Sequence, residues 1–218
     1  MLQKPEGCSL CSLFNKGIGF VPDKVAKHPK YLYIGEAPGK NEVAAAEPFI
    51  GKAGFVLKQW VIKAVPHMQL AWEKGEITLA NTLRCLPPEI KGRAYPKGEE
   101  KLQAEACCRQ YDNFADTVHT VILFGESPQR CFFKEELEAE DVSDRYLGRD
   151  VKGVMGRVGR EYVKDGKRYV FAPHPAFVLR QPSIVEHAQA ALRIAANIEQ
   201  IVEPEVMKWE DTIELLRA

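Results

Sequence analysis

Three polar residues that could do chemistry stand directly after apolar runs, in widely separated parts of the sequence. They are Glu36, Asn81 and His174. A carboxylate can act as a base, an amide offers a donor beside an acceptor, and an imidazole can donate a hydrogen bond to an oxygen that gains charge. These groups can act together only if the fold brings them to one place.

The elements that must position these residues alternate along the chain. Four apolar runs have the length and composition of buried strands: 31–34, 76–80, 120–125 and 168–172. Stretches with helical periodicity lie between and after them, and this alternation predicts an α/β fold, a parallel sheet with helices on both faces. The carboxyl ends of parallel strands share one edge, where ligands bind. We therefore expect the three polar residues around a single pocket.

One domain accounts for most of the chain. We expect it to span 1–203, with a charged surface insertion near 134–165 and an appended amphipathic tail over 204–218. After the first strand, one predicted helix carries an apolar stripe that should pack on the core, formed by Phe55, Leu57, Trp60, Val61 and Ala64.

The composition is that of a globular protein of 218 residues, with 45% apolar and 28% charged side chains. No apolar run is long enough to cross a bilayer, and the N-terminus lacks the apolar core of a signal peptide. We therefore expect a cytoplasmic protein without a membrane partner. The formal net charge is zero, from 30 basic and 30 acidic residues, which argues against a uniformly basic surface but is compatible with one basic face.

Six cysteines in a cytoplasmic chain favour metal or cluster ligation, or burial as small apolar groups, over disulfides. Cys8 and Cys11 form a C-x-x-C pair, a spacing that zinc, iron–sulfur and redox sites all use. Cys85 is followed by Pro87 and Pro88, which stiffen the backbone and suit a ligand that is held in place.

Four segments, taken in order, resemble family four of the uracil-DNA glycosylases. They are Gly35-Glu36-Ala37-Pro38-Gly39 with Glu42, Phe49 to Gly54, Asn81 to Pro88, and His174 to Arg180. Each segment is weak alone, but their order, the matching cysteines and the span to about residue 200 make the resemblance specific. It implies a DNA repair enzyme that flips uracil out of DNA and hydrolyses its N-glycosidic bond, leaving an abasic site. It also implies a three-layer α/β/α sandwich on a four-stranded parallel sheet.

The resemblance implies a [4Fe–4S] cluster on four cysteines, which correspond here to Cys8, Cys11, Cys85 and Cys108. Cys107 stands beside the last of these, and the following Arg109-Gln110-Tyr111 favours Cys108. Zinc also accepts four cysteines and is the alternative that the residues leave open. The implied role of the cluster is structural, because it would tie the N-terminal segment to the middle of the chain.

The resemblance assigns the catalytic roles to Glu36 and His174. His174 would donate a hydrogen bond to the uracil oxygen where negative charge collects. Ala37 stands at a substrate-binding position where another family of these glycosylases has an aspartate, so no general base is evident there. Glu36 is the candidate for orienting the attacking water.

The remaining substrate contacts follow from the same resemblance. The amide of Asn81 would match the ring N–H and carbonyl of uracil, an arrangement that cytosine reverses. Phe49 would stack on the flipped base, and Glu42 would lie near the ring edge that carries a methyl group in thymine. The loop that would wedge into DNA and meet a phosphate is formed by Val178, Leu179 and Arg180.

Other functions remain open at this point. A non-enzymatic iron–sulfur DNA-binding protein could keep the same fold, and the charged segment and the tail leave room for such divergence. A relative that traps its product through a histidine carries a basic motif and a glutamine after the first glutamate, whereas this chain has Ala37 and no such motif. A nucleotide hydrolase would need the Lys-Ser/Thr ending of a P-loop, which Gly35 to Gly39 lacks. The expected partner is uracil-containing DNA, single- or double-stranded, bound by a monomer.

Overall fold

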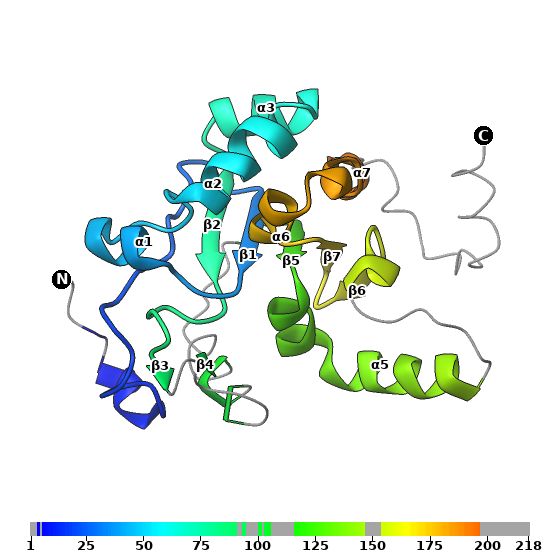
Figure 1. Cartoon of the computed structure of the whole chain (residues 1–218). Coiled ribbons are helices and arrows are strands. Elements are labelled where there is room, and N and C mark those ends of the chain that lie inside the picture. Colours follow the sequence, from blue (N-terminus) through cyan, green and yellow to red (C-terminus); the bar gives the residue numbers. More distant parts are fainter. Residues whose placement is uncertain are drawn as a thin grey trace.

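The computed structural model describes residues 4, 6–90, 93–94, 100–101, 103–105, 116–146 and 154–196. Within these residues a five-stranded sheet has the order β2-β1-β5-β7-β6, and its strands are β1 (Tyr31–Gly35), β2 (Ile77–Asn81), β5 (Thr120–Phe124), β6 (Glu161–Lys164) and β7 (Lys167–Ala172) (Figure 1). β2, β1, β5 and β7 are parallel, and β6 runs antiparallel to β7. The α/β class is confirmed. The expected sheet had four parallel strands, whereas the observed sheet has a fifth strand, β6, that is antiparallel.

The register of the parallel strands brings their carboxyl ends to one level. Gly35 of β1 lies opposite Asn81 of β2, and Phe124 of β5 lies opposite Ala172 of β7. The residues that leave these four strands therefore gather along one edge of the sheet, as the alternating sequence pattern predicts.

Helices cover both faces of the sheet, because successive strand residues point to opposite sides. Tyr31 and Tyr33 belong to a core with α2 (Lys52–Val56), a π-helix (Leu57–Ile62), α3 (Pro66–Glu73), α6 (Pro175–Arg180) and α7 (Val185–Ala196). Leu32 and Ile34 belong to a second core with α5 (Glu126–Tyr146). In Figure 1 the first group lies in the upper part of the view and α5 at the lower right. None of the described helices is both long and apolar enough to cross a membrane.

The shorter elements lie at the ends of the strands or in the loops. They are the 3₁₀-helices Glu6–Leu10, Val154–Arg157 and Pro182–Ile184, the helix α1 (Lys40–Ala45), and the small hairpin of β3 (Glu89–Ile90) and β4 (Arg93–Ala94). The expected tail over 204–218 lies outside the described residues.

The charged segment near 134–165 was expected as a surface insertion, and the structure describes its two ends, 134–146 and 154–165. Its first residues continue α5, and its end forms β6. Asp165 and Gly166 connect β6 to β7 with φ of 51° and 71°, and positive φ at both central residues is the geometry of a tight hairpin turn. Arg157 in the same segment is buried. The end of the segment therefore adds the antiparallel strand β6 to the edge of the sheet.

Candidate active site

Gly35, the last residue of β1, lies where side chains from three parts of the chain converge. A methyl group added at its Cα would lie 2.7 Å from Oδ1 of Asn81, 2.7 Å from Cζ of Phe49 and 3.2 Å from Nε2 of His174. Asn81 ends β2, His174 follows β7, and Phe49 lies between α1 and α2. The fold thus brings together the two polar residues that were expected to meet, and Gly35 forms the floor between them.

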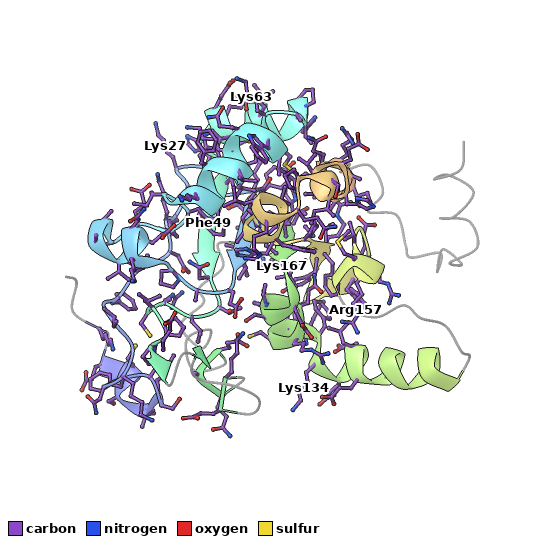
Figure 2. The ribbon with its side chains drawn as sticks, in the orientation of Figure 1. Lys27, Phe49, Lys63, Lys134, Arg157 and Lys167 are labelled. Carbon is purple, nitrogen blue, oxygen red and sulfur yellow. The ribbon has the colours of Figure 1, made fainter. Side chains whose placement is uncertain are left out.

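Phe49 is held in an unusual backbone conformation. Its φ is 57°, the left-handed region, which costs a non-glycine residue roughly 1–2 kcal/mol. Gly54 makes this conformation possible, since a methyl group there would lie 1.6 Å from the Phe49 carbonyl oxygen. The ring lies 6.5 Å from that of His174, at an interplanar angle of 29°, and Figure 2 shows Phe49 close to the strand ends. The surrounding structure therefore fixes an aromatic face beside the pocket.

His174 presents a specific nitrogen to the pocket. Its Nδ1 accepts a hydrogen bond of 3.1 Å from the backbone N–H of Ala176, in the first turn of α6. A neutral imidazole that accepts at Nδ1 carries its proton on Nε2, and Nε2 is the atom that faces Gly35. Gly125 leaves room on the other side, because a methyl group there would lie 3.1 Å from Cβ of His174. The ring therefore offers an N–H donor to a ligand.

The imidazole of His174 is held neutral. Burial lowers its pKa from 6.5 to about 4, the charge of Glu36 opposes this shift, and that of Arg180 adds to it. Because burial outweighs the carboxylate, the ring is uncharged at neutral pH, and its Nε2 donates without placing a cation in the pocket.

Asn81 is fixed by hydrogen bonds that join the loops after β1 and β2. The N–H of Thr82 donates to the carbonyl of Gly35 at 2.9 Å, and the N–H of Leu83 donates to that of Glu36 at 2.9 Å. The hydroxyl of Thr82 donates to the same Glu36 carbonyl at 2.8 Å. Asn81 itself is 6% exposed, so a ligand that meets its amide meets a buried group on a fixed backbone.

Glu36 lies at the rim of the pocket. Its side chain is 52% exposed, and its Oε1 forms a short ion pair with Nζ of Lys101. The next residue, Ala37, is partly buried and packs against the apolar group of Leu83 and Cys85. Lys101 was not among the residues predicted for this site, because nothing in its local sequence distinguishes it from other lysines.

The carboxylate of Glu42 is held by backbone groups of two loops. Its Oε1 accepts from the N–H of Gly51 at 2.8 Å, and its Oε2 accepts from the N–H of Gly39 at 3.1 Å. The residue is buried, and both carboxylate oxygens are engaged by backbone. Glu42 therefore joins the loop after β1 to the loop that carries Phe49, and its expected place near the methyl edge of the base stays a prediction.

The expected DNA wedge on α6 divides into a buried and an exposed part. Val178 is fully buried in the core beneath α6, so it is not available for insertion, which corrects that part of the prediction. Leu179 is 37% exposed, and Arg180 is also exposed. Successive residues of a helix point about 100° apart, which explains why one neighbour enters the core and the next faces outward.

Comparison with known proteins places this geometry in a family. Residues 22–197 match the model of the uracil DNA glycosylase superfamily. The chain belongs to this superfamily. Curated relatives named type-4 uracil-DNA glycosylase include that of Archaeoglobus fulgidus, 26% identical over 84% of this chain and 83% of its own, and that of Pyrobaculum aerophilum, 25% identical over 91% and 94%. A third, from Sulfurisphaera tokodaii, is 25% identical over 81% of this chain and 73% of its own.

A second site of this glycosylase-superfamily chain gathers its cysteines. Cys8, Cys11 and Cys85 line one small cavity, together with Lys4, Leu13, Phe14, Phe20 and Arg84. Gly17 forms its wall at Cys85, since a methyl group there would lie 2.4 Å from Sγ. Burial raises the pKa of the Cys85 thiol to about 11, so its thiolate requires a cation nearby. Three soft donors around an apolar cavity suit an iron–sulfur cluster.

The fourth expected ligand, Cys108, and its neighbour Cys107 lie outside the described residues. Among the described residues, no group of three or more His, Cys, Asp or Glu side chains is arranged to hold a metal ion. Three of the four predicted cysteines therefore line one cavity, although in the described residues their side chains do not form a metal-binding arrangement.

Proposed function

We propose that this protein is a uracil-DNA glycosylase, a hydrolase that removes uracil from DNA and leaves an abasic site. The observation that supports this most directly is the convergence of Asn81, Phe49 and the Nε2 of His174 over Gly35. Superfamily membership and relatives that carry the name type-4 uracil-DNA glycosylase agree with it. The proposal assigns each of these side chains one role.

Recognition of the base is assigned to Asn81 and Phe49. A flipped uracil offers a ring N–H beside a carbonyl, and the Asn81 amide can pair with both at once. Cytosine reverses this pattern and would leave a buried amide unpaired, which is a strong means of rejection. Phe49 stacks on the ring and is insensitive to which base enters. Selectivity for uracil therefore comes from Asn81.

Catalysis is assigned mainly to His174. When the bond between deoxyribose and uracil breaks, negative charge develops on the uracil oxygens. The neutral Nε2–H of His174 donates to one of these oxygens, and a donor fixed in advance contributes about 10²–10³-fold in rate. Glu36 orients the water that attacks the sugar. Ala37 leaves room for this water without supplying a base of its own.

DNA binding is assigned to the exposed end of α6. Leu179 would fill the space that the flipped base leaves, and Arg180 would contact a phosphate. Since the chain has no net charge, we expect moderate affinity that weakens as salt increases.

We propose that Cys8, Cys11, Cys85 and Cys108 hold a [4Fe–4S] cluster, with zinc as the less favoured occupant. The cluster would supply a covalent tie between the N-terminal segment and the segment after β2, and no chemical step is assigned to it. The predictions of a domain over 1–203, a tail over 204–218, a monomer and a cytoplasmic location stay predictions.

The test is an excision assay with end-labelled oligonucleotides that carry one uracil, thymine or cytosine. Alkali cleaves abasic sites, so product at the uracil position alone supports the proposal. The assay is run on single strands and on duplexes with uracil opposite guanine or adenine, and it is repeated with His174→Ala. A protein that binds uracil-containing DNA but leaves every oligonucleotide intact, even in excess over DNA, would instead be the non-enzymatic DNA-binding protein.

A further inference from the structure

A buried acid outside the pocket contacts two of the strand-end loops that form it and is connected to a third through Thr82. Oε1 of Glu105 accepts a short hydrogen bond from the hydroxyl of Ser127, which begins α5 just after β5. The hydroxyl of Thr82, after β2, lies 3.4 Å from the same oxygen and 3.3 Å from the hydroxyl of Ser127. Since the Thr82 hydroxyl also donates to the carbonyl of Glu36, this cluster reaches the loop after β1 as well.

Glu105 also faces Lys101, one helical turn earlier. Nζ of Lys101 lies 3.9 Å from Oε1 of Glu105 and forms an ion pair with Oε1 of Glu36. The ammonium group is thus placed between a carboxylate at the pocket rim and a carboxyl group that is 1% exposed. An exposed ion pair between two flexible side chains is weakly ordered. Because the buried carboxyl group of Glu105 holds Lys101 in place, the ion pair of Lys101 with Glu36 is more ordered than a pair between two exposed side chains.

A purely structural role explains Glu105 poorly. Burial raises its pKa, an effect that Ser127 and Lys101 oppose, and its Oε2 has no hydrogen-bond partner in the described part of the chain. An apolar residue of similar size would fill the same space without this desolvation cost. What an apolar residue could not do is hold Lys101 in place beside Glu36.

We propose that Lys101 is a positioning residue of the glycosylase reaction, anchored by Glu105, and that it acts by holding the carboxylate of Glu36 at the pocket rim. This inference rests on the proposed function and on the role of Glu36 in orienting water. DNA carries negative charge and would repel an unpaired carboxylate at this place. The ammonium group of Lys101 neutralises Glu36 and keeps it in one position when DNA binds.

The test is a double-mutant cycle on a wild-type protein already shown to excise uracil, so that failure of the proposed function is recognised first. We expect Lys101→Met to lower kcat about tenfold with little change in KM, within the roughly 100-fold that a misplacement of 1 Å can cost. In the Glu36→Gln background the same substitution should change kcat less than twofold, because the group on which Lys101 acts has been neutralised. Lys101→Arg should recover most of the activity.

Two further variants distinguish positioning of Glu36 from a general effect of surface charge near the pocket. Glu105→Gln keeps the acceptor for Ser127 but removes the charge behind Lys101, and it should lower kcat in the wild type and not in Lys101→Met. Lys16→Met is the matched control, because Lys16 forms an exposed ion pair of 4.0 Å with Glu100, the neighbour of Lys101; it should leave kcat unchanged.

Three results would overturn the inference. Lys101→Met could lower kcat equally in both backgrounds, or Glu36→Gln could be fully active. Lys101→Met could also raise KM and weaken the salt dependence at unchanged kcat, which would make Lys101 a phosphate contact.

Discussion

Replacement of Gly35 by alanine tests the central geometry of the pocket. The added methyl group would lie 2.7 Å from both Oδ1 of Asn81 and Cζ of Phe49, whereas ordinary contact begins at 3.4 Å. Each side chain must therefore retreat by about 0.7 Å, or the backbone must shift by a similar amount. Gly35 has no positive φ, so the backbone itself accepts alanine and the effect is confined to these contacts.

The expected result is a large loss of activity with a smaller loss of stability. A misplacement of about 1 Å at reacting groups can cost roughly 100-fold, so we expect kcat/KM for uracil excision to fall roughly 10–100-fold. Overpacking costs about 1–3 kcal/mol, and a chain of this size loses about 2–4 °C in Tm per kcal/mol. Thermal melting followed by circular dichroism and the alkali-cleavage assay measure the two effects separately.

Gly166→Ala is the control for this experiment. Gly166 has a φ of 71°, and an added methyl group would meet no atom within 4 Å. The substitution therefore strains the backbone of a turn far from the pocket in sequence, lowering Tm without lowering kcat/KM. If Gly35→Ala excises uracil at the wild-type rate, the three side chains do not form the substrate pocket, and the assignment of Asn81 and His174 is refuted.

Three other predictions use the same assays. The pKa of His174 falls from 6.5 to about 4 on folding, so between these values the unfolded chain binds a proton that the folded chain does not. The free energy of unfolding should therefore decrease as pH falls through this window. The excision rate should show no ionisation near pH 6.5, and an ionisation there would contradict a neutral donor. Cys85→Ser should reduce the visible absorption of the cluster and the Tm more than the excision rate per folded molecule, and an unchanged spectrum with normal melting would count against ligation. Leu179→Ala should lower excision from duplex more than from single-stranded DNA, since only a duplex has a gap to fill; equal losses would remove its role as a wedge.

The sequence predicted the parallel part of the sheet because buried parallel strands read as continuous apolar runs. It failed at β6, whose residues Glu161–Lys164 are exposed or partly buried and therefore carry no such signal. The signal that was available is the dipeptide Asp165-Gly166, which favours a tight hairpin when it stands between two strand-like segments. Composition alone made the segment appear to be a surface insertion.

The apolar stripe on the helix after the first strand was only partly predicted. Leu57 and Val61 are fully buried, but Phe55 is 59% exposed and Trp60 is 37% exposed. The helix changes to a π-helix at Leu57, and its wider turn breaks the regular spacing that the prediction assumed. Local periodicity cannot reveal such a change, because tertiary packing decides it.

The candidate site shows a similar division between what sequence can and cannot give. Asn81 and His174 were predictable because topology alone brings strand ends together. The environment of Glu42 was not, since its two backbone donors, Gly39 and Gly51, are turn residues whose N–H directions depend on the folded loops. Lys101 was missed for the same reason, because its partners are distant in sequence.

The arrangement of polar groups around the pocket favours stabilisation of the leaving base. His174 is partly buried and neutral, its proton is fixed on Nε2 by the Ala176 N–H, and the backbone after Asn81 is held by the bonds of Thr82. The His174 donor is oriented before the base arrives, so it needs no reorganisation as charge moves onto uracil. Glu36, in contrast, is half exposed and forms an ion pair with Lys101 at the rim of the pocket. The leaving base, rather than the attacking water, is therefore what this pocket is built to stabilise.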